Sequence, residues 1–171
     1  MSDAAAHEAR VGEILTRFDE TAARLIARLE RAGDRDAPPD GGWTPAQIGA
    51  HVAMVNNSFA SVVDGSGPGA TPPADGFVER AWADMVRNVP ERNQAPARFV
   101  PPATTAIGDA VRDLKAGTAK LREALSGLTP ERSRLCFTHR LFGAMTLYQV
   151  GDFAIAHMIR HNQQVKRVLG E

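Results

Sequence analysis

The chain has 171 residues, a length that suits one domain, and its 43% apolar content is enough to fill a core. Twenty basic and twenty acidic residues cancel, which argues against broad binding to nucleic acid or to an anionic membrane, since both need a basic surplus. The single cysteine, Cys136, excludes an intrachain disulfide, and no run approaches the ~18 apolar residues of a membrane span. We therefore expect one cytoplasmic domain over 1–171, with no nucleic-acid or membrane partner.

The first predicted element is an amphipathic helix that ends before the Gly- and Pro-rich stretch 32–42. Its apolar residues recur at spacings of three and four while charged residues take the other faces, which is the pattern of a helix with one buried stripe. The stripe consists of Val11, Ile14, Leu15, Phe18, Ala22, Leu25, Ile26 and Leu29.

The second predicted helix has a clear start signal in "WTPAQIGAHVAMV". Thr44 can cap it, Pro45 suits the first helical position, and Gln47 completes a capping box. The residues 64–76 are rich in Gly and Pro and are typical of a loop. One face of this helix carries Ile48, His51, Val55, Phe59 and Val62.

The middle of the chain gives weaker signals. Residues 77–87 are compatible with a short helix, and the Pro-rich stretch 88–103 is expected to run extended over the surface. A third long helix is predicted from about Thr105 to Leu125, because its apolar residues alternate steps of three and four. Strand signals in "ARFVP" and "RLCFT" are short and isolated.

The fourth long helix is predicted to begin near "MTLYQVGDF", where Thr146 and Gln149 repeat the capping-box spacing. Four amphipathic helices around one core are the most economical architecture, so the predicted fold class is all-α, a four-helix bundle with a loop-rich connection between the second and third long helices. One face of the fourth helix carries Val150, Phe153, Ala154, His157, His161, Val165 and Val168.

His157 and His161, in "AIAHMIRHNQQV", lie four residues apart on one helix face, where two imidazoles can reach one metal ion. A metalloprotease reading loses its main support, because Met158 stands where the HExxH motif has its Glu. By spacing alone, two ordinary helix residues remain the simpler explanation. However, the pair lies on an apolar face, and so does His51 on the second helix. If these helices are neighbours, one divalent cation can satisfy all three buried imidazoles and keep a coordination position open.

The remaining histidines and the cysteine give no comparable pattern. His7 lies near a chain end that is expected to fray, and we assign it no role. His139 is expected in a loop before the fourth helix, near the mouth of the site or without a function. Cys136 is expected to be a small buried residue, since reactive thiols need a lowered pKa.

Four further residues near these histidines are candidates for a role at the site. Asp152 is turned off the face of His157 and is expected to be solvated on the helix surface. Gln164 can orient a ligand or substrate, or lie at the surface without a role. Trp43 and Phe142 can wall a pocket or pack in the core.

Two stretches of the chain resemble the DinB-like superfamily. "GGWTPAQIGAHVAMVNNSF" is similar to its Trp-Ser/Thr-Pro opening of the second helix, which leads to a His, and "HRLFGAMTLYQVGDFAIAHMIRHNQQVKRVL" is similar to its closing segment with a His-xxx-His helix. The resemblance covers nearly the whole chain. It implies a four-helix bundle, often a homodimer, with a metal held by His51, His157 and His161. Relatives include transferases and isomerases that use mycothiol or bacillithiol, and many members have no established reaction.

Two main functions follow from this reading. The first is a metal-dependent enzyme in which a divalent ion, zinc or nickel, activates water or a low-molecular-weight thiol for hydrolysis, S-transfer or isomerisation of a small-molecule substrate. The second is a metal-binding or dimerisation module without a catalytic role. A third alternative is a histidine triad that is hydrogen-bonded in the core without a metal. No other acid or base has a spacing that dictates a catalytic role.

Overall fold

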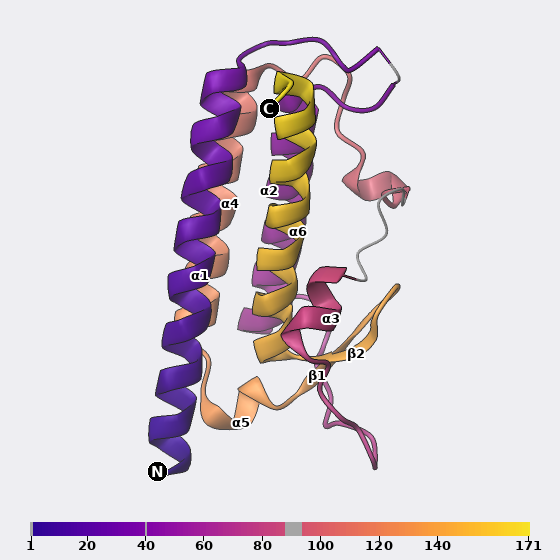
Figure 1. Ribbon diagram of the computed structural model, residues 1–171. Helices are drawn as coiled ribbons and strands as arrows, with labels where there is room; N and C mark the ends of the chain where they lie inside the picture. The colour runs from indigo at the N-terminus through magenta and orange to yellow at the C-terminus, as the bar shows by residue number, and fades with distance from the viewer. Residues whose placement is uncertain (1, 40, 88–93) are drawn as a thin grey trace.

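Four long helices lie side by side in the computed structural model, which describes residues 2–39, 41–87 and 94–171 (Figure 1). They are α1 (Asp3–Ala32), α2 (Pro45–Asp64), α4 (Ile107–Ser126) and α6 (Leu147–Leu169). The shorter elements are α3 (Trp82–Arg87), the 3₁₀ turn η1 (Ala97–Phe99), α5 (Pro130–Ser133), β1 (Cys136–His139) and β2 (Gly143–Thr146). The prediction of an all-α fold with a loop-rich connection before the third long helix is confirmed.

Helices α2 and α4 run in the same direction and approach closely. Gly49 lies against Ala110 near their starts, and Gly117 lies against Ala53 further along. A Cβ at position 117 would lie 2.9 Å from the Ala53 carbonyl oxygen, so glycine at this position lets the two backbones approach. The polypeptide must therefore return along the length of the bundle between α2 and α4, which accounts for the long connection over residues 65–106.

Helices α1 and α6 form the second parallel pair. Gly151, near the start of α6, lies against Ile14, and Arg28 near the end of α1 donates to Asn162. The core runs along the bundle between the two pairs and is filled by the apolar stripes predicted from the sequence. Among the described helices, none combines the length and the apolar content needed to cross a membrane.

Both predicted helix starts are found, but only one capping box closes. The Thr44 side chain accepts from the Gln47 backbone N–H, and the Gln47 side chain accepts from the Thr44 backbone N–H. Thr146 likewise accepts from the Gln149 backbone N–H. The Gln149 side chain instead donates to the Arg80 carbonyl oxygen at 2.9 Å, so the second capping box is formed in one direction only. The tertiary contact with Arg80 therefore holds the Gln149 side chain away from the Thr146 backbone N–H that a complete capping box would use.

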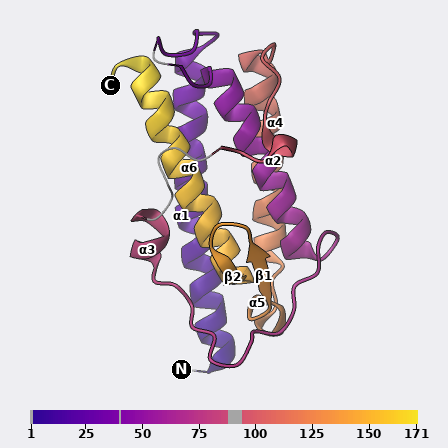
Figure 2. The ribbon, with the colours of Figure 1, turned by 90° about the vertical axis from the view of Figure 1, so that its right-hand side faces the viewer.

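The middle of the chain differs from the sequence prediction in detail. The short helix expected over 77–87 begins only at Trp82, and residues 88–93 of the expected extended stretch lie outside the described residues. Strands β1 and β2 pair antiparallel, with Cys136 opposite Thr146, and form a hairpin where α6 begins (Figure 2). Strands of four residues are too short for an alternating pattern to stand out, so "RLCFT" gave only a weak signal and β2 gave none.

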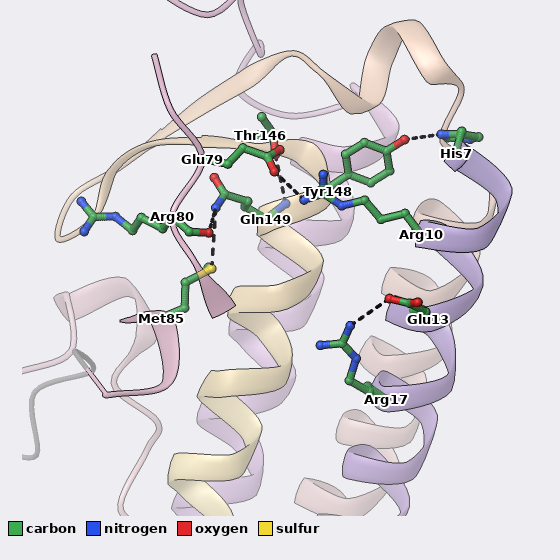
Figure 3. Close-up of polar contacts among 10 residues, drawn as sticks. All are labelled: His7, Arg10, Glu13, Arg17, Glu79, Arg80, Met85, Thr146, Tyr148 and Gln149. Atoms are coloured by element: carbon green, nitrogen blue, oxygen red, sulfur yellow. Dashed lines mark hydrogen bonds and ion pairs between the residues drawn. The ribbon is translucent and has the colours of Figure 1, made fainter. Parts of the chain in front are cut away.

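The connection after α2 docks on the start of α6 through Glu79 (Figure 3). The Glu79 carboxylate accepts from Arg10 of α1 at 2.7 Å and from the Thr146 hydroxyl at 2.5 Å. The neighbouring Arg80 carbonyl oxygen holds Gln149, as described above. These contacts hold α1, the connection and the first turn of α6 together, and so fix the helix that carries His157 and His161.

Candidate metal centre

His51 of α2 and His157 and His161 of α6 meet in the core. The His157 Nε2 atom lies 3.1 Å from His51 Nε2 and 3.0 Å from His161 Nε2. All three side chains are buried, with exposed fractions of 4–8%. In the described part of the chain, no other group of three or more histidine, cysteine or acidic side chains is placed to hold a metal ion. The sequence prediction that these three residues converge is therefore correct.

The outer nitrogens of two rings are held by oxygen atoms. His51 Nδ1 lies 2.8 Å from the Phe99 carbonyl oxygen, and His161 Nδ1 lies 2.6 Å from Gln164 Oε1. An oxygen acceptor at this distance requires the proton on Nδ1, which leaves the Nε2 lone pair of each ring facing His157. Metal-binding histidines characteristically donate their other N–H in this way. Gln164 thus orients His161, which selects one of the two roles that the sequence left open.

Burial keeps the three imidazoles neutral. Desolvation lowers the pKa of His51, lowers that of His161 to about 3, and lowers that of His157 well below its ordinary value. The neighbouring histidines add to the shift at His157, and Arg160 lowers the pKa of all three rings. Neutral imidazole is the form that binds metal, so no proton has to be removed at neutral pH.

Three neutral rings in this arrangement lack one proton for their mutual hydrogen bonds. Only His157 can place an N–H between the Nε2 atoms, because His51 and His161 carry theirs at Nδ1. His157 Nδ1 is itself buried and has no hydrogen-bond partner among the described residues. A cation among the Nε2 atoms removes this lone-pair conflict. The coordinating nitrogens of three imidazoles on a tetrahedral zinc ion lie about 3.3 Å apart, close to the 3.1 and 3.0 Å that separate His157 Nε2 from the other two Nε2 atoms. The residues present therefore fit a divalent metal ion.

Aromatic rings enclose the histidines on two sides. The Trp43 ring lies 4.7 Å from the His51 ring and stacks on His161 at 6.5 Å, measured between centroids. The Phe153 ring stacks on His157 at 6.0 Å. Trp43 is therefore part of the wall of the site, which is one of the two roles predicted for it from the sequence. Its position follows from the segment before α2, which places it one residue ahead of the Thr44 cap.

The other predicted aromatic wall, Phe142, does not reach the histidine cluster. Its ring packs on Phe153 and on His139 instead. His139 is the last residue of β1 rather than a loop residue, and Phe153 stands between it and His157. Burial lowers the pKa of His139 to about 4. Its Nδ1 accepts from the Leu141 backbone N–H, so it serves the hairpin.

Two further sequence expectations are corrected by the structure. The first helix starts at Asp3, so His7 does not lie in a frayed end. Its Nδ1 accepts from the Tyr148 hydroxyl (Figure 3), and its Nε2 donates to the Leu128 carbonyl oxygen. Asp152 is half-buried rather than solvated, and desolvation raises its pKa. Its charged neighbours include Arg10 and Arg17 of α1, which the sequence of α6 alone does not reveal.

Sequence reasoning missed one contributor to the centre, the Phe99 carbonyl oxygen. It belongs to η1, in the stretch read as a weak strand signal, and it acts through the backbone, so its residue type carries no sign of the role. Cys136 is buried as expected, and desolvation raises the pKa of its thiol, which disfavours the reactive thiolate.

The fold and the site together define a helical bundle with a buried three-histidine centre between two of its long helices. The family model described as DinB superfamily matches residues 17–165, a range that includes all three histidines. The chain belongs to the DinB superfamily. A search of curated proteins and a search of solved structures each returned no match.

Proposed function

We propose that this protein is a metal-dependent enzyme whose metal is held by His51, His157 and His161. The observation that carries the proposal is the convergence of three neutral Nε2 atoms, at 3.0 and 3.1 Å, with two of the rings oriented from behind by oxygen acceptors. Bound there, a zinc or nickel ion would supply Lewis acidity that lowers the pKa of a water or a low-molecular-weight thiol.

The residues of the chain prepare this chemistry in three ways. Phe99 and Gln164 fix the tautomers of His51 and His161, so that no reorientation is needed on binding. Trp43 and Phe153 exclude water from the sides of the imidazoles, which strengthens electrostatic interactions at the site. Three protein ligands are one fewer than a closed structural zinc site uses, which favours catalysis over a purely structural role.

The reaction class we propose is hydrolysis, or transfer or isomerisation of a small electrophile with a thiol such as mycothiol or bacillithiol. The nucleophile is water in the first case and the thiol in the second. A homodimer, suggested by the resemblance, remains a prediction as well. A closed, non-catalytic metal site and a metal-free triad are the alternatives that the experiment below must separate from it.

The test is metal content followed by activity. Untagged protein is analysed by elemental mass spectrometry, beside His157→Asn and a matched control, His139→Asn, whose ring lies behind Phe153. We expect about one equivalent of zinc or nickel in the wild type and in the control, and none in His157→Asn. Circular dichroism checks that all three proteins are folded.

Activity is then screened with ester, amide and electrophile–thiol substrate sets, using metal-stripped and reconstituted protein. The proposal requires turnover that is lost on stripping, restored by metal, and absent in His157→Asn. Equal turnover with and without metal would contradict it. In the cobalt-substituted protein, a cobalt absorption spectrum that does not change when azide or thiol is added would indicate a closed site and the non-catalytic module.

A further inference from the structure

A second polar feature lies between α1 and α6, on the half of the bundle that contains the end of α1. It is a surface cavity of about 410 Å³, within the size range of small-molecule sites. We call it the α1–α6 groove. Arg24, Arg28 and Arg31 line it from α1, where their spacings of three and four place them on one helix face. The residues that complete its lining are Ala27, Asn162, Gln163 and Lys166.

The lining of this groove is strongly one-signed. Four cationic side chains line it, and no acidic side chain of the described residues is part of the lining. The chain as a whole has equal numbers of basic and acidic residues, so this concentration is local. A Lys or Arg in the last turn of a helix also favours the helix dipole, which accounts for Lys166 and Arg31 separately. The helix dipole does not account for Arg28 or Arg24, which lie further from the end of α1, although Arg24 also pairs with Glu20, one turn earlier on α1, at 2.8 Å.

A carboxylate already lies against the arginines of the groove. The Glu171 side chain forms ion pairs with Arg31 and with Arg28, whose Nε lies 3.3 Å from Glu171 Oε2. The same Arg28 Nε–H is buried and makes no hydrogen bond among the described residues. Glu171 therefore compensates the charge of the guanidinium but leaves this N–H donor without an acceptor. Asn162 Oδ1 accepts from Arg28 Nη1 at 2.5 Å, which holds the guanidinium in place.

We propose that the α1–α6 groove binds a small molecule that carries two or more oxyanion groups, phosphate or carboxylate. Guanidinium groups match both kinds of oxyanion with paired N–H donors. One oxyanion group of the ligand would replace the Glu171 carboxylate on Arg28 and Arg31. Lys166 lies further along the same lining for a second anionic group, beside Arg24, which also pairs with Glu20 at 2.8 Å. Glu171 is an internal competitor, which the ligand displaces. This site does not depend on the histidine centre.

The test is calorimetric titration of the full chain with pyrophosphate and, in parallel, with the tricarboxylate tricarballylate, at constant ionic strength. We expect saturable binding of at least one probe. Arg31→Met should weaken it about tenfold, because one charge-assisted pair is lost. Glu171→Gln should strengthen it severalfold by removing the competitor. Arg31 is 56% exposed and Glu171 34%, so these variants are expected to fold.

The matched control is Arg122→Met. Arg122 is an exposed arginine of α4 that pairs with Asp19, and its loss should leave the affinity unchanged. Equal weakening in Arg122→Met and Arg31→Met would show diffuse charge attraction and overturn the proposal, as would the absence of saturable binding. Binding that survives Arg31→Met but is lost in His157→Asn would place the probe on the metal and overturn it too. Sedimentation with phosphatidylserine vesicles, without binding of either soluble probe, would assign the surface to lipid instead.

Discussion

Replacing Gln164 with leucine tests whether the hydrogen bond from His161 Nδ1 to Gln164 orients this imidazole for metal binding. The change removes the oxygen that lies 2.6 Å from His161 Nδ1, while glutamine and leucine have nearly equal helix propensity, so α6 itself should be unaffected. Loss of such an outer acceptor typically weakens metal binding by 10- to 100-fold, or about 1.4–2.7 kcal/mol. Gln164 is only half-buried, so water can partly replace it, and we expect the lower end, about tenfold.

The affinity is measured by competition between metal-stripped protein and a chelating dye for zinc. Thermal melts at fixed zinc give a second readout, because each tenfold loss of affinity removes about 1.4 kcal/mol of metal-linked stability. The neighbouring change Gln163→Leu is the control, since Gln163 is exposed. The reasoning is refuted if Gln164→Leu binds zinc like the wild type, which would mean that packing on Trp43 alone orients the ring. An equal loss in Gln163→Leu would refute it as well.

Three further predictions concern packing, pH and spectroscopy. Gly117→Ala should destabilise the fold by about 1 kcal/mol or more, because its Cβ would lie 2.9 Å from a backbone oxygen of α2. Gly12→Ala has open space around it and should stabilise the fold by up to ~1 kcal/mol; urea unfolding measures both changes. His139 has a pKa of about 4 in the folded state, below its ordinary 6.5, so its contribution to stability is complete above pH 6.5 and is lost as the pH falls toward 4. After a discount for partial exposure, the free energy of unfolding of the wild type, measured in urea, should fall by about 1 kcal/mol more than that of His139→Gln between pH 7 and 5. In Trp82→Phe protein, copper or nickel at the centre should quench the remaining Trp43, whose ring lies 4.7 Å from His51; unchanged fluorescence at saturating metal would contradict this placement.

The main elements were predictable because their signals are local. Thr44, Pro45 and Gln47 specify the start of α2 within four residues, and the structure closes that capping box as written. The α1 and α4 stripes repeat over enough turns to identify amphipathic helices. The hairpin escaped notice because each strand has only four residues and its pairing joins segments with no periodic signal of their own. The one-sided capping box at Thr146 was also not predictable from local sequence, because the Gln149 side chain donates to Arg80, which is distant in the sequence.

The candidate site divides along the same line. The sequence by itself placed His157 and His161 on one face of a helix, because a spacing of four is one helical turn, and it placed His51 on the apolar face of another. Only the tertiary structure decided that these faces meet with Nε2 atoms 3.0 and 3.1 Å apart, that the Phe99 carbonyl oxygen and Gln164 hold two rings from behind, and that Phe153 separates His139 from them. Helix periodicity records which way a side chain points, but the distance between two helices and the backbone atoms that reach a ring depend on how the whole chain packs.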